Sequence, residues 1–498
     1  MIKIKTFLCA LILAGSAGVA LGQEAPPAAQ QGGFDASALT TEQIHNVQVA
    51  EVLFRLVGAY KQQNDDVRLT AALERLAELR PGNGDVKLAL AATYAEQGEK
   101  TKTYDTLLAL QKEGFGYDLT DNPNFKKVAD TKVWTYAVDM LKANLKPFGE
   151  GKVAFTLPGG DHLFESLVFD SKRQRFLVGS VRDGSISIVG KDGKLTDFIK
   201  PDAANGLWSV YAMALAPDAD ALYVASTSSV YFKGFKQADY GKAGVFKFNL
   251  STGKLIAKYL LAPDRDVRTL SSIAAGRDGL VFAADGIRNQ IYRVDHGKLK
   301  LMVENPRLTS VRGLALSGDD KILYFADYSL GLFGVDLSAG KGFDVHFNPQ
   351  LLSLAGIDGL YWYDHTLAII QNGIVPRRVM RLSLSADGRT VTKVMPLDVA
   401  NPALALPTYG TIDGDGLYFV ANSQKNQYGN YGNPKDGAKL QAVQVFRSDL
   451  RFAWDKGGID MHEVAPGKSA PGGVVSASTP GAGQFSDVQG GSESVTGN

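Results

Sequence analysis

Hydrophobic and polar positions follow two different periods along the chain. Between residues 39 and 146, apolar residues recur at the three-to-four-residue spacing of amphipathic helices. From Phe155 onward, short apolar runs with period-2 alternation are separated by Gly and Asp turns, which is typical of β-strands. We therefore predict a helical domain over residues 39–146, followed by an all-β domain over residues 151–455.

The helical region contains an internal repeat. Tyr60 and Tyr94 lie 34 positions apart, and the same offset relates three pairs of leucines: Leu56 and Leu90, Leu73 and Leu107, Leu76 and Leu110. This spacing resembles that of tetratricopeptide repeats. Two repeats register, and further helix is expected between Asn122 and Leu145. Because about three repeats are needed for independent stability, we expect the region to pack against the β domain that follows it. It would serve either as a groove for a protein partner or as a cap on that domain.

One unit recurs six times in the β region: a small residue, an apolar run, a turn and a second apolar run. The copies begin at Glu165, Tyr211, Ser271, Arg312, Asp358 and Tyr409. Six such copies, each long enough for about four strands, predict a six-bladed β-propeller. Two independent β-sandwiches are the alternative, but they would not need six copies in register.

The second residue of every copy is small. These residues are Ser166, Ala212, Ser272, Gly313, Gly359 and Gly410. The innermost strands of a propeller converge on one axis, where bulky side chains would collide. The first residues should therefore form a ring at the mouth of the central channel, and we predict a ligand-binding site at Glu165, Tyr211, Ser271, Arg312, Asp358 and Tyr409.

A second polar set follows the second apolar run of each copy: Ser180, Ser226, Asp285, Asp327, Asn372 and Asn422. An antiparallel hairpin returns these residues to the level of the ring, one layer further out. Asp327 is the member that we add to the predicted ligand-binding set. Ordinary turn chemistry is the alternative for each of them.

Two long loops should open toward the same face. They span Thr227 to Lys242 and Ser423 to Lys439, and both combine Tyr or Phe with Lys. Such loops can form lids over polar or anionic ligands, or they can be surface decoration.

Composition and net charge limit the classes of protein to which this chain can belong. The chain has 498 residues, a formal net charge of +1 and 45% apolar residues, so it can bury more than one core. This charge balance does not suggest a nucleic-acid partner. The ends are predicted to lie outside both domains, with residues 23–38 as a linker and residues 457–498, rich in Gly and Ser, as a disordered tail.

The N-terminal segment predicts export. Residues 1–22 combine Lys3 and Lys5, an apolar stretch and a small-residue cleavage motif, as secretory signal peptides do. Cleavage there would remove Cys9, the one cysteine of the chain. We expect a periplasmic or secreted protein without disulfides and without a transmembrane segment after cleavage.

Four stretches carry a resemblance to a known family: "FESLVFD", "VRGLALSGDDKILYFADY", "IDGLYWYD" and "YGTIDGDGLYFVANSQ". They resemble the senescence marker protein, gluconolactonase and luciferin-regenerating enzyme family, regucalcin-like six-bladed propellers, over residues 155–445. The resemblance implies a Ca²⁺ or Zn²⁺ ion at the axial mouth and hydrolysis of sugar lactones. Of the family's metal ligands, Glu and Asp fall on Glu165 and Asp358. The two Asn ligands fall on Ser271, which keeps one hydroxyl oxygen, and on Arg312.

Arg312 is the main departure from that family's pattern. A guanidinium has five donors and no acceptor, so it cannot ligate a metal. At about 4 Å and an effective dielectric of 20, it would repel a dication by about 8 kcal/mol. We interpret Arg312 as replacing the metal's charge, between Glu165 and Asp358 or paired with Asp327. It could then close the channel by ion pairs, or recognise a ligand carboxylate or phosphate bidentately.

No second catalytic constellation is evident. The six histidines form no H-x-H or H-E-x-x-H pair, and the chain has no G-x-S-x-G motif. His162, three residues before Glu165, is a candidate base, and Asp358 is the other catalytic candidate. We therefore predict a module that binds a small polar or anionic ligand, or a protein partner through the helical repeats. The alternatives are a lactonase, with the metal on Glu165 and Asp358 or with His162 and Arg312 replacing it, and a scaffold closed by ion pairs.

Overall fold

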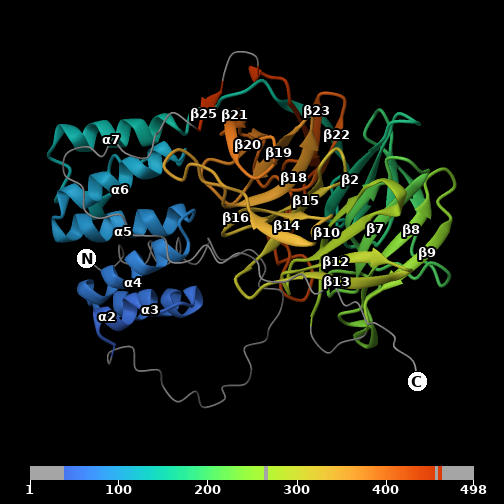
Figure 1. The fold of residues 1–498 in the computed structure, drawn as a ribbon, viewed down its shortest axis with the longest axis horizontal. Helices are drawn as coiled ribbons and strands as arrows, with labels where there is room; N and C mark the ends of the chain where they lie inside the picture. Colours follow the sequence, from blue (N-terminus) through green and yellow to red (C-terminus); the bar gives the residue numbers. More distant parts are fainter. Residues whose placement is uncertain (1–38, 263–266, 455–457, 462–498) are drawn as a thin grey trace.

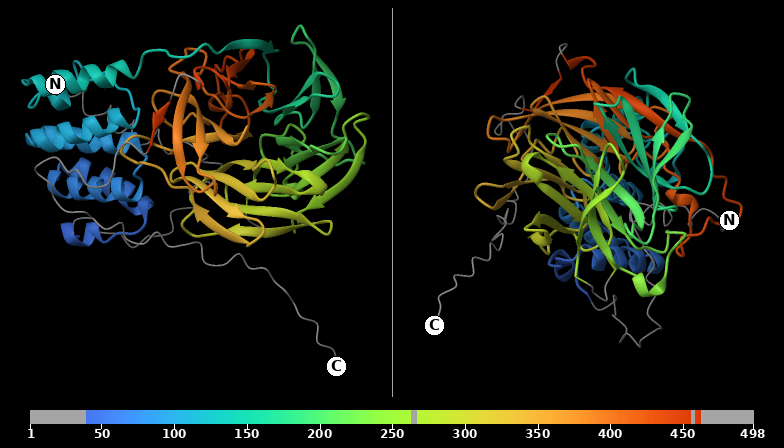
Figure 2. Two further views of the ribbon diagram at one scale, coloured as in Figure 1. Left: turned by 45° about the horizontal axis from the view of Figure 1, so that its top comes forward. Right: turned by 90° about the vertical axis from the view of Figure 1, so that its right-hand side faces the viewer.

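The computed structural model describes residues 39–262, 267–454 and 458–461. A stack of helices lies beside a β-propeller (Figure 1). The left view of Figure 2 again shows the helices beside the propeller, and the right view shows them behind it. The predicted signal peptide, the linker and most of the Gly/Ser-rich tail lie outside the described residues. Within the predicted tail, Ile459 and Asp460 form a short strand, so the prediction of disorder is wrong for these two residues. No helix of the described chain is long and apolar enough to cross a membrane.

The helices follow the predicted repeat. They are α2 (Thr41–His45), α3 (Ala50–Gln63), α4 (Asp66–Leu79), α5 (Gly84–Gln97), α6 (Lys100–Lys112) and α7 (Lys132–Ala143), with a short 3₁₀ turn η2 (Pro123–Phe125) before α7. The starts of α3 and α5 are separated by the same offset as Tyr60 and Tyr94, and so are the starts of α4 and α6. Side chains cap several starts, since Asp65 accepts from the Arg68 N–H and Asn83 from the Val86 N–H. The assignment of these helices to the tetratricopeptide class stays a prediction.

The β region is a six-bladed propeller, as predicted. Each blade is one antiparallel sheet, and in the first four blades all strands follow one another in sequence. The first blade is β2 (Phe164–Asp170), β3 (Arg175–Ser180), β4 (Ile186–Val189) and β5 (Leu195–Ile199); the second is β6 (Ser209–Leu215), β7 (Ala221–Thr227), β8 (Ala243–Asn249) and β9 (Leu255–Leu260); the third is β10 (Leu270–Ala275), β11 (Val281–Asp285), β12 (Gln290–Asp295) and β13 (Lys298–Glu304). The fourth is β14 (Val311–Leu316), β15 (Ile322–Asp327), β16 (Gly331–Asp336) and β17 (Lys341–Asp344), and the fifth is β18 (Ile357–Tyr363), β19 (Thr366–Gln371), β20 (Arg378–Leu384) and β21 (Val391–Val399).

The sixth blade closes the ring with a strand from the other end of the domain. Its inner strands are β22 (Gly410–Asp413), β23 (Gly416–Val420) and β24 (Val443–Asp449), and its outer strand is β1 (Lys152–Leu157). A two-residue strand, β25 (Ile459–Asp460), extends the fifth blade beyond β21. The chain thus fastens the propeller by pairing the first strand of the domain with the last blade.

The helical region packs on the fifth blade through the loop between β19 and β20. Ile374, 4% exposed, belongs to the helical core, and the Gly116 N–H donates to the Val375 carbonyl at 2.9 Å. Arg378, at the start of β20, donates to the carbonyls of Glu113 and Gly114 from the helical side and of Ser353 from the propeller, at 3.2–3.4 Å. The two parts are therefore joined by a buried guanidinium as well as by apolar contact.

We expect replacement of Arg378 to loosen this joint. Its Nε also donates to Gln371 Oε1 at 2.7 Å, so Arg378→Met would leave several buried acceptors unpaired. The expected loss is about 3 kcal/mol of unfolding free energy. Calorimetry should show the helical region melting before the propeller. Arg451→Met, at an exposed ion pair, is the control, and a single unshifted transition for Arg378→Met would contradict the role given to the guanidinium.

A second buried charge holds the chain where the propeller begins. Asp398, 1% exposed, accepts a hydrogen bond from the Gly151 N–H at 2.8 Å and another from the Ser448 hydroxyl. Burial raises the pKa of Asp398 from 3.8 to about 6, although both hydrogen bonds lower it.

The sign of this shift predicts a pH dependence. Because the folded-state pKa is higher, the stabilisation from protonating Asp398 is complete below about pH 4 and is lost as the pH rises through 6. Asp398→Asn removes this dependence. Between pH 4 and pH 7, its unfolding free energy should rise relative to wild type by about 3 kcal/mol. Denaturant titrations at both pH values measure the change, and a pH-independent difference would refute it.

Candidate functional site

The six predicted ring residues share one backbone feature, a β-bulge at the start of the innermost strand. In the first blade Phe164 pairs with Ser180 and Ser166 with Gly179, so Glu165 is the extra residue. The same shift leaves Tyr211, Ser271 and Asp358 unpaired in the second, third and fifth blades, and it falls at Arg312 and Gly313 in the fourth. A bulge turns the extra residue out of the alternation of the sheet. All of these positions can therefore face the axis.

The sixth blade repeats this arrangement just before its first strand. The Thr408 N–H donates to the Val420 carbonyl, and the Val420 N–H donates to the Tyr409 carbonyl at 3.2 Å, whereas Gly410 pairs with Phe419. Thr408 and Tyr409 therefore both lie opposite Val420, as the two residues of a bulge do. Electrostatic interactions link Tyr409 with Arg312, Asp358 and Glu165. The structure thus brings together residues from blades that are far apart in sequence.

Charges at the ring are balanced by two cations. Arg312 Nε lies 3.7 Å from Asp358 Oδ1, and both side chains are about 10% exposed. Glu165, 6% exposed, accepts a hydrogen bond from the Ser423 hydroxyl. The second cation is Lys425, which interacts electrostatically with both carboxylates. Two carboxylates therefore face one guanidinium and one ammonium group.

Burial governs the acidities of this group. It raises the pKa of both Glu165 and Asp358, and the positive charges of Lys425 and Arg312 oppose that rise. Burial also lowers the pKa of Lys425. The negative charges of Glu165 and Asp358 oppose this change, whereas the positive charge of Arg312 adds to it. Burial therefore favours the neutral form of each of these three groups, and their oppositely charged neighbours counteract this effect.

Arg312 has further neighbours on its own blade. Its Nε donates to Ser310 Oγ at 3.1 Å, and its guanidinium lies 5.2 Å from the centre of the Tyr328 ring. The Tyr328 hydroxyl in turn donates to Asn372 Oδ1 at 3.0 Å. These contacts hold the guanidinium beside Asp358.

Three ring residues carry buried polar atoms for which the described part of the chain supplies no hydrogen-bond partner. They are Ser271 Oγ, Asp358 Oδ1 and the Tyr409 hydroxyl, and Ser166 Oγ directly below the ring is a fourth. Of these, Asp358 Oδ1 and Tyr409 also interact with Arg312, whose Nε lies 3.7 Å from Asp358 Oδ1. Buried polar atoms are nearly always paired in proteins. A group of unpaired ones around one axis indicates a place where a polar molecule fits.

Residues of both predicted lid loops pack against one ring residue, Tyr211. Tyr231 from the first loop and Tyr428 from the second have ring centres 6.3 Å apart and form an apolar cluster with Tyr211, Leu163 and Val181. The Tyr211 hydroxyl donates to Ser229 Oγ at 2.9 Å. Tyr211 thus anchors the lid from below.

His162 belongs to an ion cluster of the lid. Its Nδ1 lies 2.7 Å from Asp183 Oδ2, and Lys233 Nζ lies 2.7 Å from Asp183 Oδ1. Although burial opposes it, hydrogen bonds from His162, Lys233 and Ser180 lower the pKa of Asp183 to about 2. The structure therefore engages this candidate base with a carboxylate outside the ring.

Two members of the outer polar set, Asp327 and Asp285, stabilise turns. Asp327 is fully buried and accepts from the backbone N–H groups of Thr309, Ser310, Ser329 and Leu330. Asp285 holds the corresponding turn of the third blade, with Oδ1 accepting from Thr269, Ile287 and Arg288. The ion pair of Arg312 goes to Asp358, so the interpretation that Asp327 balances Arg312 is corrected.

The donor set does not fit a divalent cation. Within residues 39–262, 267–454 and 458–461, no three His, Cys, Asp or Glu side chains converge as metal ligands would. The two acidic positions that the family resemblance implies are present, but a guanidinium lies 3.7 Å from one of them. Calcium and zinc sites need several oxygen, nitrogen or sulfur ligands free of such a neighbour.

Lys425 is the site residue that sequence reasoning missed. It begins the 3₁₀ turn η5 (Lys425–Gln427) inside the second lid loop. The presence of lysines in that loop was the available signal. Which of them turns inward depends on the path of the loop, which the pattern of residues does not encode.

The charge balance predicts the effect of metal. Arg312→Asn replaces the guanidinium by an amide oxygen and should allow Ca²⁺ to bind at least tenfold more tightly than in wild type. Calorimetric titration with CaCl₂ measures this difference, with Arg451→Asn as the control. One tightly bound Ca²⁺ in wild type, lost in Glu165→Gln, would contradict the assignment.

The sequence matches no protein-family profile and no curated protein. Solved structures with a similar fold include regucalcin from Agrobacterium tumefaciens, described as a calcium-binding protein, with 16% identity over 60% of this chain and 95% of that one and a TM-score of 0.42. A luciferin-regenerating enzyme has 14% identity over 60% and 95% of the two chains and the same TM-score. A gluconolactonase from Xanthomonas campestris has 14% identity over 62% and 92%, with a TM-score of 0.38. Similarity at this level carries no argument about what the site binds.

Proposed function

We propose that this protein binds a small polar or anionic ligand at the axial ring of its propeller, in the periplasm or outside the cell. The observation that carries the proposal is the set of unpaired buried atoms on Ser271, Asp358 and Tyr409, next to a charge-balanced group. A ligand with a hydroxyl and a carboxylate matches these atoms. Its hydroxyl would donate to Asp358, and its carboxylate would accept from Arg312, Ser271 and Tyr409.

Binding accounts for the site better than hydrolysis does. Lactone opening needs a general base or a metal-activated water. Asp358 pairs with Arg312, and His162 pairs with Asp183. His162 is held through its Nδ1 in the cluster with Asp183 and Lys233, outside the ring, so the ring residues are better suited to hold and orient a ligand than to activate water.

We assign the helical region the role of a cap. Its core includes Ile374 of the propeller, and its carbonyls accept from Arg378. These contacts use surface that a free partner groove would expose. Association with another protein through the remaining helical surface is the weaker interpretation.

The test is calorimetric binding of two small hydroxy acids, gluconate and 3-hydroxybutanoate. Arg312→Gln should weaken binding of whichever acid binds by at least tenfold, because a charge-assisted hydrogen bond contributes about 1.5–3 kcal/mol. The exposed Arg451→Gln is the matched control. Glucono-lactone turnover that Asp358→Ala abolishes would refute pure binding in favour of the hydrolase. Equal affinities for Arg312→Gln and wild type would refute the placement of the site.

A further inference from the structure

The charged groups of the axial ring are closed to solvent in this structure. Glu165, Arg312 and Asp358 are 6–9% exposed. The central channel contains a cavity of about 430 Å³, but none of these three residues is among those that line it. A molecule that enters this cavity from the far end of the channel would therefore not contact the ring charges. A ligand of the ring has to approach from the side of the lid loops.

The two lid loops are in direct contact with each other. The first connects β7 with β8 in the second blade, and the second connects β23 with β24 in the sixth. A Cβ atom added to Gly432 of the second loop would lie 2.2 Å from the Val230 carbonyl oxygen of the first. The second loop also reaches the ring, because the Ser423 hydroxyl donates to Glu165. To uncover Glu165, the second loop has to move away from the ring and from the first loop.

Arg182 joins both lid loops to the first blade. It lies in the turn between β3 and β4, and the first blade packs against both the second and the sixth blades, which carry the loops. Its Nη1 donates to the Tyr231 carbonyl of the first loop at 2.5 Å, and its guanidinium lies 5.5 Å from the centre of the Tyr428 ring of the second. Asp161 holds the same guanidinium by two hydrogen bonds, of 2.6 and 2.9 Å. Arg182 is 5% exposed, so these contacts are made inside the molecule.

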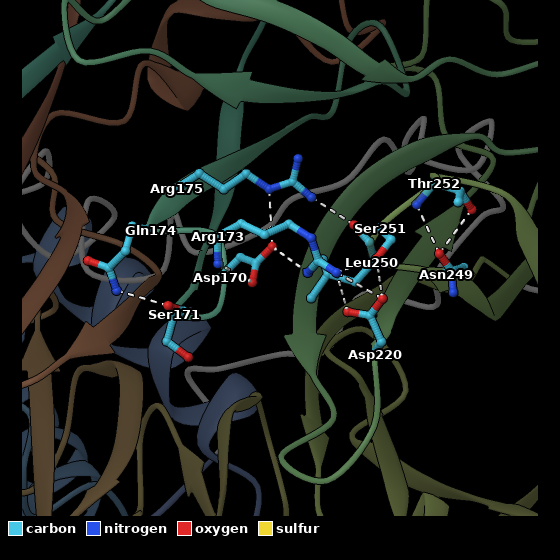
Figure 3. Close-up of polar contacts among 10 residues, drawn as sticks. All are labelled: Asp170, Ser171, Arg173, Gln174, Arg175, Asp220, Asn249, Leu250, Ser251 and Thr252. Carbon is cyan, nitrogen blue, oxygen red and sulfur yellow. Dashed lines mark hydrogen bonds and ion pairs between the residues drawn. The ribbon is translucent and has the colours of Figure 1, made fainter.

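The first blade carries a comparable arginine at its other end (Figure 3). Arg173 lies in the turn between β2 and β3, 2.9 Å from Asp170 Oδ2 and 2.8 Å from Asp220 Oδ1. Both aspartates line the channel cavity. The bonds of Arg173 therefore join turns of the first two blades at the far end of the channel, and they provide a control for an ion-paired arginine that does not bond to the lid loops.

We propose that Arg182 holds the two lid loops closed over the axial ring, and that a ligand enters and leaves the ring when these contacts open. This inference rests on the proposed function and describes the regulation of the same site. Opening breaks the same contacts whether the ring is free or occupied. Arg182 therefore slows association and dissociation alike, and it sets how fast the ring exchanges its ligand more than how tightly the ligand binds.

Hydrogen–deuterium exchange tests the hold on the loops. Arg182→Met removes the ion pair and the contacts with both loops. In the full chain, amides of residues 227–242 and 423–439 should exchange about tenfold faster than in wild type, because local opening sets their exchange rate. Arg173→Met is the matched control and should leave both loops unchanged. Loops that exchange at the wild-type rate in a folded Arg182→Met variant would overturn the proposal.

Asp161→Asn is the second variant, in case Arg182→Met does not fold. It keeps the volume of the side chain at residue 161 and removes its charge from the pair with Arg182. Exchange in both loops should rise in the same direction by a smaller factor. Unchanged exchange in Asp161→Asn as well as in Arg182→Met would exclude this ion pair as the hold on the loops.

Lys425 reports whether the ring itself is uncovered. Its ammonium group is half-buried and interacts electrostatically with Glu165 and Asp358. A short pulse of acetic anhydride should acetylate Lys425 about tenfold faster in Arg182→Met than in wild type, because the reagent reaches the amine through the opened loops. The exposed Lys172, at the far end of the channel, should react equally in both proteins. Equal labelling of Lys425 would refute opening of the ring.

Ligand kinetics separate this inference from the proposed function. Gluconate and 3-hydroxybutanoate are the probes, measured by surface plasmon resonance on the immobilised full chain. Arg182→Met should raise both rate constants of whichever acid binds, each about tenfold, and change Kd by less than about threefold. Damage to the binding groups would instead raise dissociation alone, so that result would contradict the proposal. If neither acid binds to wild type, the proposed function fails, and the exchange and labelling results still decide whether Arg182 holds the loops.

Discussion

The convergence of six innermost strands on one axis is the constraint on which the rest of the structure depends. A Cβ atom added to Gly313 on β14 would come within 2.8 Å of the backbone nitrogen of Leu360 on β18, the innermost strand of the next blade. Small residues are therefore required directly after the ring positions. The bulge at each ring position turns a larger side chain out of the sheet, so polar groups can gather where the backbones leave little space.

Charged side chains that gather on a buried axis repel one another when their charges have the same sign. In this chain, positively charged side chains offset the repulsion between the carboxylates. Two carboxylates facing each other away from water would each raise the other's pKa. Arg312 from the fourth blade and Lys425 from the lid loop supply the opposing charges. The resemblance to a metal-binding family predicts Glu165 and Asp358 at the mouth, and in the structure both interact with Arg312 and Lys425. Lys425 supplies a second positive charge, so that both carboxylates can lie there although only one guanidinium is beside them.

The hydrophobic periodicity of the sequence predicted those parts of the fold that depend on residues close together in the chain. The recurring unit identified the blades, and the small residue after each start identified the ring, because both patterns are written in consecutive residues. The outer strand β1, the inward turn of Lys425 and the bond from Arg378 to Glu113 were not predictable in this way. Each depends on which distant segment the closed ring brings near, and a single sequence carries no local signal for such contacts.

The short loop between β19 and β20 links the two halves of the molecule. Asn372 at its start accepts from Tyr328, which lies against the guanidinium of Arg312. Ile374 enters the helical core, and Arg378 at its end bonds to helical carbonyls. Displacing the helices would therefore release the loop whose first residue supports Tyr328. The helical region therefore helps to support the axial site, because it packs on the blade that carries Asp358.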